Sequence, residues 1–427
     1  MGLGHFGGGV AAARYLARQG ARITVTDLAD EAALSDSLNA LQGEVISEFH
    51  LGGHRQRDFS VGDLVVVNPA VRPENPLLEV ARRHGVALSS EIELFMRACP
   101  APIIAVTGSN GKSTTAAMTA AIFEADGRRT WLGGNIGRSL LENLDEIGPD
   151  DAVVLEISSF QLEHLGNDAP SPRIAVVTGC RANHLDWHGS YRSYVRAKQR
   201  ILTCQTPNDL AVLNTHDAEV GAWGRLVRGR QLPIDQPPVV LAVPGEHNRI
   251  NAACAAAAAA GAGCDLEVIR TALEAFAGLP QRLEQCAVVA GRRFYNDSTA
   301  TTPESTVAAL ESLEGPLWLL AGGRDKGCDF NVLTAATAEN ARGAAFFGET
   351  GEALQRALAA ENANLPSTTV KTMAQALQWC WACSRPGDAI LLSPGCASGD
   401  QFADFRRRGE QFVDLVHALA DSLEDDG

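Results

Sequence analysis

The chain has 427 residues and a formal net charge of −15, and 45% of its residues are hydrophobic. This composition is typical of a globular protein with about two to four domains, and the negative charge argues against a nucleic-acid-binding protein, which would need a basic face. No apolar stretch reaches the ~18 residues of a membrane span, and no signal-peptide-like segment follows Met1. The 10 cysteines show no disulfide-framework spacing, so we expect a cytoplasmic protein that does not associate with membranes.

The first predicted unit spans residues 1–97 and opens on a glycine turn. Gly2-Leu3-Gly4-His5-Phe6-Gly7 precedes a predicted helix over 10–19, and a predicted strand over 21–27 ends on Asp27. A G-x-G-x-x-G turn, followed about 20 residues later by an acid at a strand end, is the dinucleotide-type fingerprint. The strand of about 5 residues that should precede the glycines is missing from the printed sequence. We therefore expect the natural chain to begin upstream of Met1.

The second predicted unit spans residues 98–278 and begins with a phosphate-loop pattern. The β-branched run 103–107 leads into Gly108-Ser109-Asn110-Gly111-Lys112-Ser113-Thr114, and a helix is predicted over 116–126. In such a loop, backbone N–H groups face a phosphate, Lys112 adds a positive charge and the Ser113 hydroxyl can ligate Mg²⁺. The standard spacing would need glycine at Val106, so this is a shorter variant. The alternative is a glycine-rich turn with a surface lysine; we favour nucleotide binding because strand, loop and helix occur in register.

Further polar residues follow strands of the same unit. A predicted strand over 152–162 carries Glu156 after an apolar run, where an acid can hold Mg²⁺ beside a phosphate loop; an ordinary exposed acid is the alternative. A predicted strand over 173–178 leads to His184, Asp186 and His188, which form either a polar site or a structural cluster. Lys198 lies on a basic helix over 191–201, whose alternative interpretation is a solvated face.

The third predicted unit spans residues 279–427. Strands are predicted over 293–298, 316–323 and 389–398, and a helix over 401–419. The sequence Cys380-Trp-Ala-Cys383 lies in a helical pattern without a second cysteine pair, so it is interpreted as helix and not as a zinc site. Strands alternate with helices along the whole chain, which predicts an α/β protein with parallel, doubly wound sheets.

Nine sequence blocks, which occur in family order, make the chain resemble the Mur ligase family. The blocks are TGSNGKST, GGNIG, LEISSFQLE, NHLDWHGSYRSYVRAKQRI, GEHNRINA, GLPQRLE, NDSTATTPEST, AGGRDKG and LLSPGCASGDQF. The resemblance implies a Rossmann-like domain for a UDP-linked substrate (1–97), a central ATP-binding domain (98–278) and a Rossmann-like glutamate-binding domain (279–427). It implies an ATP-dependent ligase that adds D-glutamate to UDP-N-acetylmuramoyl-L-alanine through an acyl phosphate, in cytoplasmic peptidoglycan precursor synthesis. We expect a monomer.

The resemblance also implies roles for individual residues. The implied catalytic residues are Lys112, Glu156, His184 and Lys198. The implied Mg²⁺ ligands are Ser113, Glu156, His184 and a carbamate formed on Lys198. ATP is implied to contact residues of the glycine loop and of the third domain: Gly108, Ser109, Asn110, Gly111, Lys112, Ser113, Thr114, Asn248, Asn251, Arg282 and Asp297. The implied substrate contacts are Leu3, His5, Phe6, Asp27, Asn135, Ser158, Thr301, Lys326, Ser398 and Phe405.

The chain departs from the family pattern at two positions near the implied glutamate site. Thr299 stands where the motif N-D-S-K-A-T has lysine, and Gly399 replaces a larger residue. The alternatives are a branch that adds L-glutamate, a folylpolyglutamate-synthase-like ligase, and an NAD-dependent oxidoreductase that rests on the first glycine turn alone. A non-catalytic nucleotide-binding regulator would be expected to lose the four implied catalytic residues, and all four are present.

Overall fold

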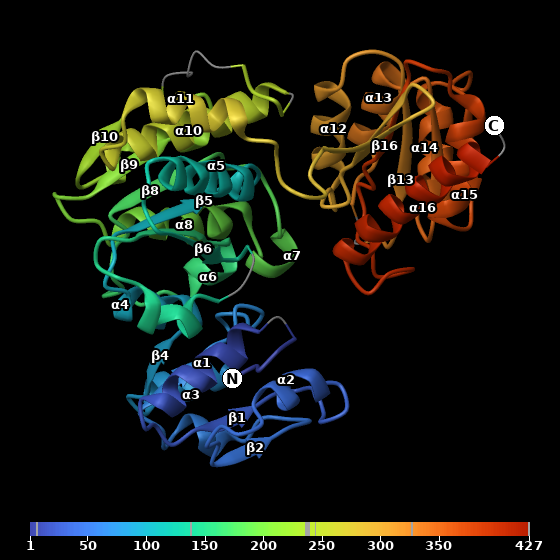
Figure 1. Cartoon of the computed structure of the whole chain (residues 1–427). Helices are drawn as coiled ribbons and strands as arrows, with labels where there is room; N and C mark the ends of the chain where they lie inside the picture. The colour runs from blue at the N-terminus through green and yellow to red at the C-terminus, as the bar shows by residue number, and fades with distance from the viewer. Residues whose placement is uncertain (6, 137–138, 235–239, 244, 326–327, 426–427) are drawn as a thin grey trace. The chain divides into compact units, whose positions relative to one another are not determined.

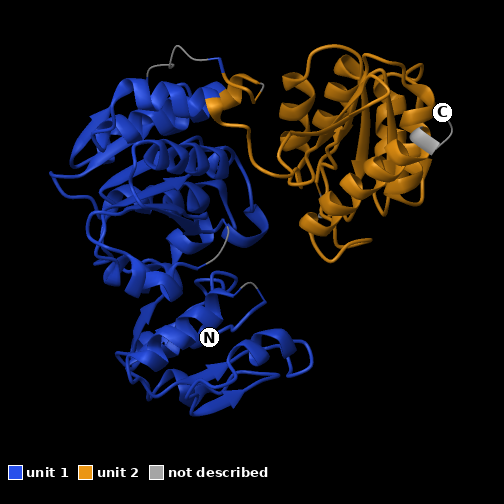
Figure 2. Ribbon diagram, in the orientation of Figure 1, with its two compact units in different colours: residues 1–240, 249–274 blue, residues 241–248, 275–427 orange. Residues whose placement is uncertain are grey.

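The computed structural model describes residues 1–5, 7–136, 139–234, 240–243, 245–325 and 328–425. By their internal contacts the residues form two compact units, the first made of 1–240 and 249–274 and the second of 241–248 and 275–427 (Figure 2). None of the helices in the described ranges is long and apolar enough to cross a bilayer. The predicted site residues Phe6 and Lys326 lie outside the described residues.

The first unit begins with two small parallel strand pairs, β1 with β2 and β3 with β4 (Figure 1). The elements are α1 (Gly8–Arg18), β1 (Thr24–Thr26), α2 (Ser35–Ala40), β2 (Glu48–His50), η1 (Gln56–Phe59), β3 (Leu64–Val66), α3 (Pro76–Arg83), β4 (Ala87–Ser89) and α4 (Glu91–Ala98). Met1 and Gly2 lie between the two pairs, because the Gly2 N–H donates to Thr26 O (2.8 Å) and the Met1 amine to Val66 O (2.9 Å). Each pair has its own small hydrophobic core.

The rest of the first unit is built on a six-stranded, wholly parallel sheet of strand order β10-β9-β8-β5-β7-β6. The elements are β5 (Ile103–Thr107), α5 (Lys112–Ala125), β6 (Thr130–Gly134), η2 (Leu141–Glu146), β7 (Ala152–Glu156), α6 (Ser159–Glu163), β8 (Ile174–Val177), α7 (Leu185–His188), α8 (Tyr191–Thr203), β9 (Leu210–Leu213), α9 (Ala218–Gly221), η3 (Ala222–Leu226), β10 (Arg230–Leu232), α10 (Glu246–Gly261) and α11 (Leu266–Ala275). The central strands are buried on both faces, as parallel strands covered by helices must be.

Alternation along these strands directs side chains to opposite faces. The odd-numbered residues of the strands, such as Ala105, Leu155 and Val177, share one core with Tyr194 and Ile201 of α8. Figure 1 shows α5 and α10 on the opposite side of this sheet. Fully burying one such leucine, valine or isoleucine side chain stabilises a fold by roughly 1.5–3 kcal/mol. The strand β5 pairs in parallel with β7 on one side and with β8 on the other. The carboxyl ends of β5, β7 and β8 therefore meet at one edge.

The second unit contains a six-stranded sheet of order β11-β12-β16-β13-β14-β15, parallel except for the β11–β12 pair. The elements are β11 (Glu284–Val289), β12 (Arg292–Asn296), α12 (Pro303–Ser312), β13 (Leu317–Gly322), α13 (Asn331–Asn340), β14 (Gly343–Phe347), α14 (Gly351–Glu361), β15 (Ser367–Val370), α15 (Met373–Cys383), β16 (Ala389–Leu392) and α16 (Phe405–Asp425). One face of the sheet packs on α12, α13 and α14, and the other on α15 and α16. This is the doubly wound arrangement that the sequence predicts.

The structure corrects several predicted element boundaries; the strand predicted over 389–398, for example, ends at Leu392. The strand predicted over 152–162 ends at Glu156, and residues 159–163 form the short helix α6. The helix predicted from Ala116 begins earlier, at Lys112, directly after the glycine loop. The helix predicted from Gln401 begins at Phe405. The Cys380–Cys383 segment is helical, as predicted, and Cys380 is buried in the core.

Candidate active site

The glycine loop joins the end of β5 to the start of α5. Gly108 and Gly111 have φ values of 159° and 80°, and a side chain would collide at both positions. A Cβ at Gly108 would overlap the Thr178 hydroxyl, and one at Gly111 would overlap the Asn251 amide oxygen. Gly111 is the N-cap of α5 and supplies no side-chain hydrogen bond to the first turn. The N-terminal amides of α5, including those of Ser113 and Thr114, thus form an end suited to an anion.

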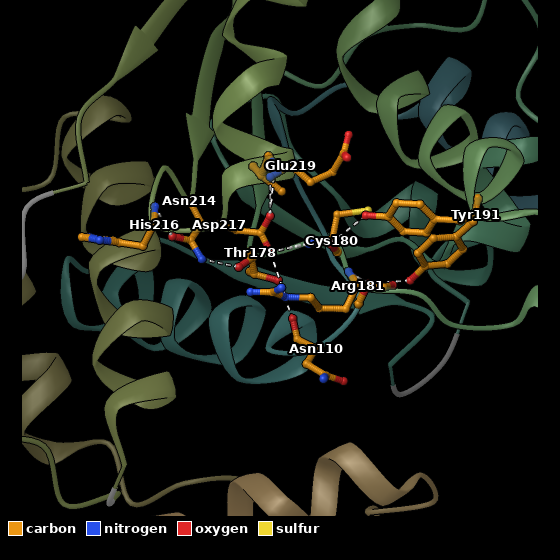
Figure 3. Close-up of polar contacts among 12 residues, drawn as sticks. Asn110, Thr178, Cys180, Arg181, Tyr191, Asn214, His216, Asp217 and Glu219 are labelled. Atoms are coloured by element: carbon orange, nitrogen blue, oxygen red, sulfur yellow. Dashed lines mark hydrogen bonds and ion pairs between the residues drawn. The ribbon is translucent and has the colours of Figure 1, made fainter. Parts of the chain in front are cut away.

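Side chains from neighbouring strands hold this loop in place. The Thr178 hydroxyl, at the end of β8, donates to Asn110 O at 2.5 Å, and Asn214 Nδ2 donates to Thr178 O at 2.7 Å. Figure 3 shows Thr178 in this position, between the loop and the segment that follows β9. In the same segment Asp217 accepts a hydrogen bond from the Cys180 N–H (3.1 Å). The glycine loop follows β5, and it is held in place by hydrogen bonds from residues that follow β8 and β9.

The Ser109 side chain also holds the glycine loop in place. Its hydroxyl oxygen accepts a hydrogen bond from the Arg181 N–H (2.8 Å) and lies 2.7 Å from the Tyr194 hydroxyl on α8. Ser109 was predicted as an ATP contact. In the structure its side chain makes hydrogen bonds that stabilise the loop itself. Tyr194 was not predicted, although the sequence contains a signal for it: Tyr194 lies four residues before Lys198 and therefore on the same face of the helix.

Two lysines reach the same carbonyl of the loop. Lys112 Nζ donates to Gly108 O and Ser109 O, both at 3.0 Å, and Lys198 Nζ donates to Gly108 O at 2.7 Å. Lys198 is 1% exposed, so the solvated-face interpretation of α8 is wrong at this residue. Burial lowers the pKa of Lys198 well below the ordinary lysine value, and the charge of Lys112 acts in the same direction, while Cys180 and Glu156 oppose it.

Glu156 ends β7, next to β5, and is 2% exposed. Its Oε1 accepts a hydrogen bond from Asn135 Nδ2 at 2.6 Å, whereas its Oε2 is buried without a hydrogen-bond partner. A buried carboxylate oxygen without a donor is costly unless a cation or ligand completes it. The donor set thus fits a hard divalent cation at Glu156. The interpretation of Glu156 as an ordinary exposed acid is wrong.

The segment after β8 separates its two histidines. His184 is the exposed N-cap of α7 with φ 52°, and its ring lies 4.7 Å from that of Phe160. His188 is buried, stacks on Phe160 and lies 3.0 Å from Ser159 Oγ. Burial lowers the pKa of His188 to about 4, with His184 and Lys198 acting in the same direction. His188 therefore has a structural role in the packing of this segment, and the exposed His184 is the histidine that a ligand can reach.

No three His, Cys, Asp or Glu side chains in the described ranges gather closely enough to hold a metal ion by themselves. Mg²⁺ usually keeps one or two protein carboxylates and takes its other ligands from phosphates and water, so a compact protein cage is not required. The predicted set of Ser113, Glu156, His184 and a Lys198 carbamate stays a prediction. Ser158, predicted as a substrate contact, caps α6 through Gln161.

Three further predicted residues, Asn251, Asn248 and Asp27, lie in two places. Asn251 lies on α10 against Gly111, with the Thr115 hydroxyl 3.4 Å from its Oδ1, and Asn248 is buried one turn earlier on the same helix. Asp27 follows β1 and accepts hydrogen bonds from the N–H groups of Gly4 (3.1 Å) and Ala29 (2.9 Å).

Around that aspartate, the side chain of Leu3 belongs to the core, so any ligand contact there must come from its backbone. His5 is exposed.

In the second unit, the predicted residues Asp297, Thr301 and Ser398 lie in the loops that follow β12 and β16, which are neighbours in the sheet. Asp297 accepts hydrogen bonds from the Leu283 N–H (3.1 Å) and from Ser393 Oγ (2.7 Å), and burial raises its pKa to about 7.

At the same edge, Phe405 begins α16, and its carbonyl accepts from Ser298 Oγ at 2.8 Å. Arg282, the remaining predicted contact, precedes β11.

Arg408 was not predicted and holds this edge together. Its guanidinium is fully buried and donates to Ser298 Oγ (3.0 Å), Ser298 O (2.9 Å) and Cys396 O (3.0 Å). The only sequence signal is an arginine on the apolar face of a helix, between Phe405 and Phe412. Its partners lie 110 and 12 residues away and cannot be read from the sequence.

Comparisons with known domain families cover most of the chain. Residues 1–90 match the family described as "Mur ligase MurD-like, N-terminal domain", residues 106–234 the "Mur ligase middle domain" and residues 281–396 the "Mur ligase, glutamate ligase domain". A protein of Geobacter metallireducens named UDP-N-acetylmuramoylalanine–D-glutamate ligase is 38% identical over 437 residues, which cover 96% of this chain and 95% of that protein. A protein of the same name from Trichlorobacter lovleyi is 37% identical, with 96% of each chain covered.

Solved structures share the fold. UDP-N-acetylmuramate–alanine ligase from Thermotoga maritima aligns with a TM-score of 0.60 at 21% identity and covers 98% of both chains. An Escherichia coli FolC structure with bound DHPP and ADP aligns with a TM-score of 0.57 at 17% identity, covering 77% of this chain and 92% of that one. At these identities the likeness concerns the architecture alone.

Proposed function

Because the chain belongs to the Mur ligase family, we propose that it joins D-glutamate to UDP-N-acetylmuramoyl-L-alanine at the expense of ATP, in cytoplasmic peptidoglycan precursor synthesis. The observation that supports this most directly is the glycine loop between β5 and α5, where Lys112 and Lys198 both reach Gly108 O. The relatives of the same name, which align over nearly the whole chain, support the choice of substrates.

A carboxylate at neutral pH is a poor electrophile, so amide formation needs activation. We propose that the alanine carboxylate of the muramoyl substrate attacks the γ-phosphate of ATP, which releases ADP and leaves an acyl phosphate. The amine of glutamate then attacks the acyl carbon, loses a proton and expels inorganic phosphate. Such chemistry depends on positioning and on neutralising phosphate charge, which the amides of α5 and the ammonium of Lys112 provide.

Glu156 and its neighbours would hold the Mg²⁺ that the family uses. The partnerless Oε2 of Glu156, the Ser113 hydroxyl and His184 are the proposed protein ligands. The ion would neutralise charge on the transferring phosphate. Asn135, which donates to Oε1, would fix the orientation of the Glu156 carboxylate, as an outer hydrogen bond commonly does for a metal ligand.

Lys198 is proposed to carry a carbamate. The ammonium first loses one proton, and the neutral amine then attacks the carbon of CO₂. A C–N bond forms as one C=O π bond opens onto oxygen, a second proton leaves the nitrogen, and the side chain becomes a carbamate anion. The support for this is position: a fully buried lysine lies beside the phosphate loop, on the same carbonyl as a second lysine. An anion there would relieve the repulsion between the two ammonium groups and add a Mg²⁺ ligand.

The test is phosphate release from ATP with UDP-N-acetylmuramoyl-L-alanine, with D-glutamate and L-glutamate compared. Release that depends on D-glutamate is the expected result. Release with L-glutamate only would assign the chain to the other branch, and release with neither would contradict the proposal. A folate-type acceptor serves as the control for the folylpolyglutamate-synthase-like alternative, for which the only structural support is the shared fold.

A further inference from the structure

The carboxyl edge of the sheet in the second unit brings three loops together. The strands β12, β16 and β13 are consecutive in the sheet, so the loops that follow them are neighbours. Arg408 joins the first two loops through Ser298 and Cys396. The third is joined to the second by the backbone, because the Arg324 N–H donates to Ala397 O at 2.7 Å. The three loops thus form one connected surface.

Arg324 extends its side chain over this surface. It is the second residue after β13, and it is exposed. A Cβ placed on Gly399 would lie 3.7 Å from both Cδ and Nη1 of Arg324, so the guanidinium end of the side chain lies beside Gly399. Ser398, the residue before this glycine, is 7% exposed and is one of the implied substrate contacts.

Of the other described arginines near this edge, Arg408 and Arg407 are held by hydrogen bonds or an ion pair, and Arg406 contacts an aromatic ring. Arg408 makes three hydrogen bonds to Ser298 and Cys396, Arg407 pairs with Glu410 at 2.8 Å, and Arg406 lies 5.7 Å from the Phe405 ring centroid. Among the described residues, no hydrogen bond or ion pair engages the Arg324 guanidinium. Arg324 therefore keeps its five N–H donors available to a ligand, and it is the arginine whose guanidinium lies beside Gly399.

We propose that Arg324 binds a carboxylate of the incoming glutamate and so helps to select a dicarboxylic amino acid. The inference rests on the proposed function. A substrate with two carboxylates must approach an enzyme of net charge −15, and this requires a local cation. A guanidinium offers two parallel N–H donors that fit a carboxylate, which makes arginine the side chain best suited to this role. Gly399 leaves the guanidinium room to meet the ligand.

The test compares steady-state kinetics of Arg324→Gln, Arg324→Lys and wild type, with the glutamate enantiomer that wild type uses. Removing one charge-assisted contact should raise the KM for glutamate about tenfold or more in Arg324→Gln, with the KM for ATP within about twofold of wild type. Arg324→Lys should lie between the two. Arg356→Gln is the matched control, because Arg356 is an exposed arginine on α14 that bonds only the carbonyl of its own helix.

Gly399→Leu provides a second, independent variant. The leucine side chain beyond Cβ would compete with the guanidinium for space, so it should raise the KM for glutamate, and it should add little to Arg324→Gln in the double variant. A glutamate KM within twofold of wild type in Arg324→Gln, or an equal rise in the KM for ATP, overturns the inference. A wild-type protein that releases no phosphate with either glutamate would instead overturn the proposed function.

Discussion

The side-chain nitrogens of Lys112 and Lys198 lie 3.0 and 2.7 Å from one acceptor, the carbonyl oxygen of Gly108. The two lysines come from different helices, α5 and α8, and the second is fully buried. Two ammonium groups on one carbonyl repel each other, so the arrangement favours the loss of one charge or its reversal. This pair is the centre of the predicted phosphate site.

Replacement of Lys198 by alanine tests the carbamate. We expect turnover to fall by about 100-fold or more, because a charge that acts on the transferring phosphate is removed. Short carboxylates such as acetate should restore part of the activity by occupying the vacated space. Lys371→Ala is the control, since Lys371 is exposed and the chain has only 4 lysines in all.

A direct measurement accompanies the kinetics. After equilibration with ¹³C-labelled bicarbonate, wild type and Lys371→Ala should show one carbamate signal that Lys198→Ala lacks. Full activity of Lys198→Ala without added carboxylate, or an unchanged carbamate signal, would contradict the prediction.

Glu156→Gln tests the metal position. Glutamine keeps the shape and the contact with Asn135 but removes the charge at Oε2, so we expect turnover to fall by about 100-fold or more and the Mg²⁺ concentration for half-maximal activity to rise. The melting temperature should not fall, because the substitution removes a buried negative charge of which one oxygen, Oε2, has no hydrogen-bond partner. Glu124→Gln, at an exposed glutamate on α5, is the control. Wild-type Mg²⁺ dependence in Glu156→Gln would remove Glu156 from the set of ligands.

Asp297 should make stability depend on pH. Burial raises the pKa of Asp297 from 3.8 to about 7, so in the folded chain the carboxyl stays protonated while the unfolded chain ionises from about pH 4 upward. Its contribution to stability is therefore present at low pH and is lost as the pH rises towards 7. Relative to wild type, Asp297→Asn should gain about 2 kcal/mol between pH 5 and 7, because the slope of ~1.4 kcal/mol per pH unit falls to about half as the folded carboxyl titrates near pH 7.

Urea unfolding at the two pH values provides the measurement. Asp414→Asn, at an exposed aspartate on α16, controls for the loss of one negative charge. An Asp297→Asn difference that stays constant between pH 5 and 7 would mean that the carboxyl is ionised throughout.

Arg408 should be a major contributor to the stability of the second unit. Arg408→Lys keeps the charge but cannot satisfy Ser298 and Cys396 together, so buried carbonyls lose their donors. We expect a loss of about 3 kcal/mol in the free energy of unfolding. The exposed neighbour Arg407→Lys should change it by no more than about 0.5 kcal/mol. Equal effects of the two substitutions would show that the buried bonds of Arg408 add little.

The sequence predicted well what depends on contiguous residues. The glycine loop, the strand that ends at Glu156 and the α/β alternation are all local patterns, and each is present in the structure. Two of the incorrect boundaries have local causes. The apolar run after Glu156 hid the capping pair Ser158 and Gln161, which begins α6, and β-branched threonines obscured the first turn of α5.

What the sequence did not predict depends on contacts between distant residues. The burial of Lys198 requires Gly108, 90 positions away, and Arg408 meets Ser298 over 110 positions. The antiparallel strand β11 is likewise defined by its pairing with β12. The hydrophobic periodicity of a helix or strand shows which of its faces is apolar, but it does not show which other element packs against that face.

The hydroxyl of Ser109, shared between α8 and the segment after β8, has a consequence for ligand affinity. Together with Thr178 and Asn214 it keeps the glycine loop in one conformation before any ligand arrives. The conformational entropy of these residues is lost once, when the chain folds, and not again at each turnover. An incoming nucleotide therefore binds to a loop that is already ordered. Its binding free energy is reduced little by the entropy cost of ordering the loop.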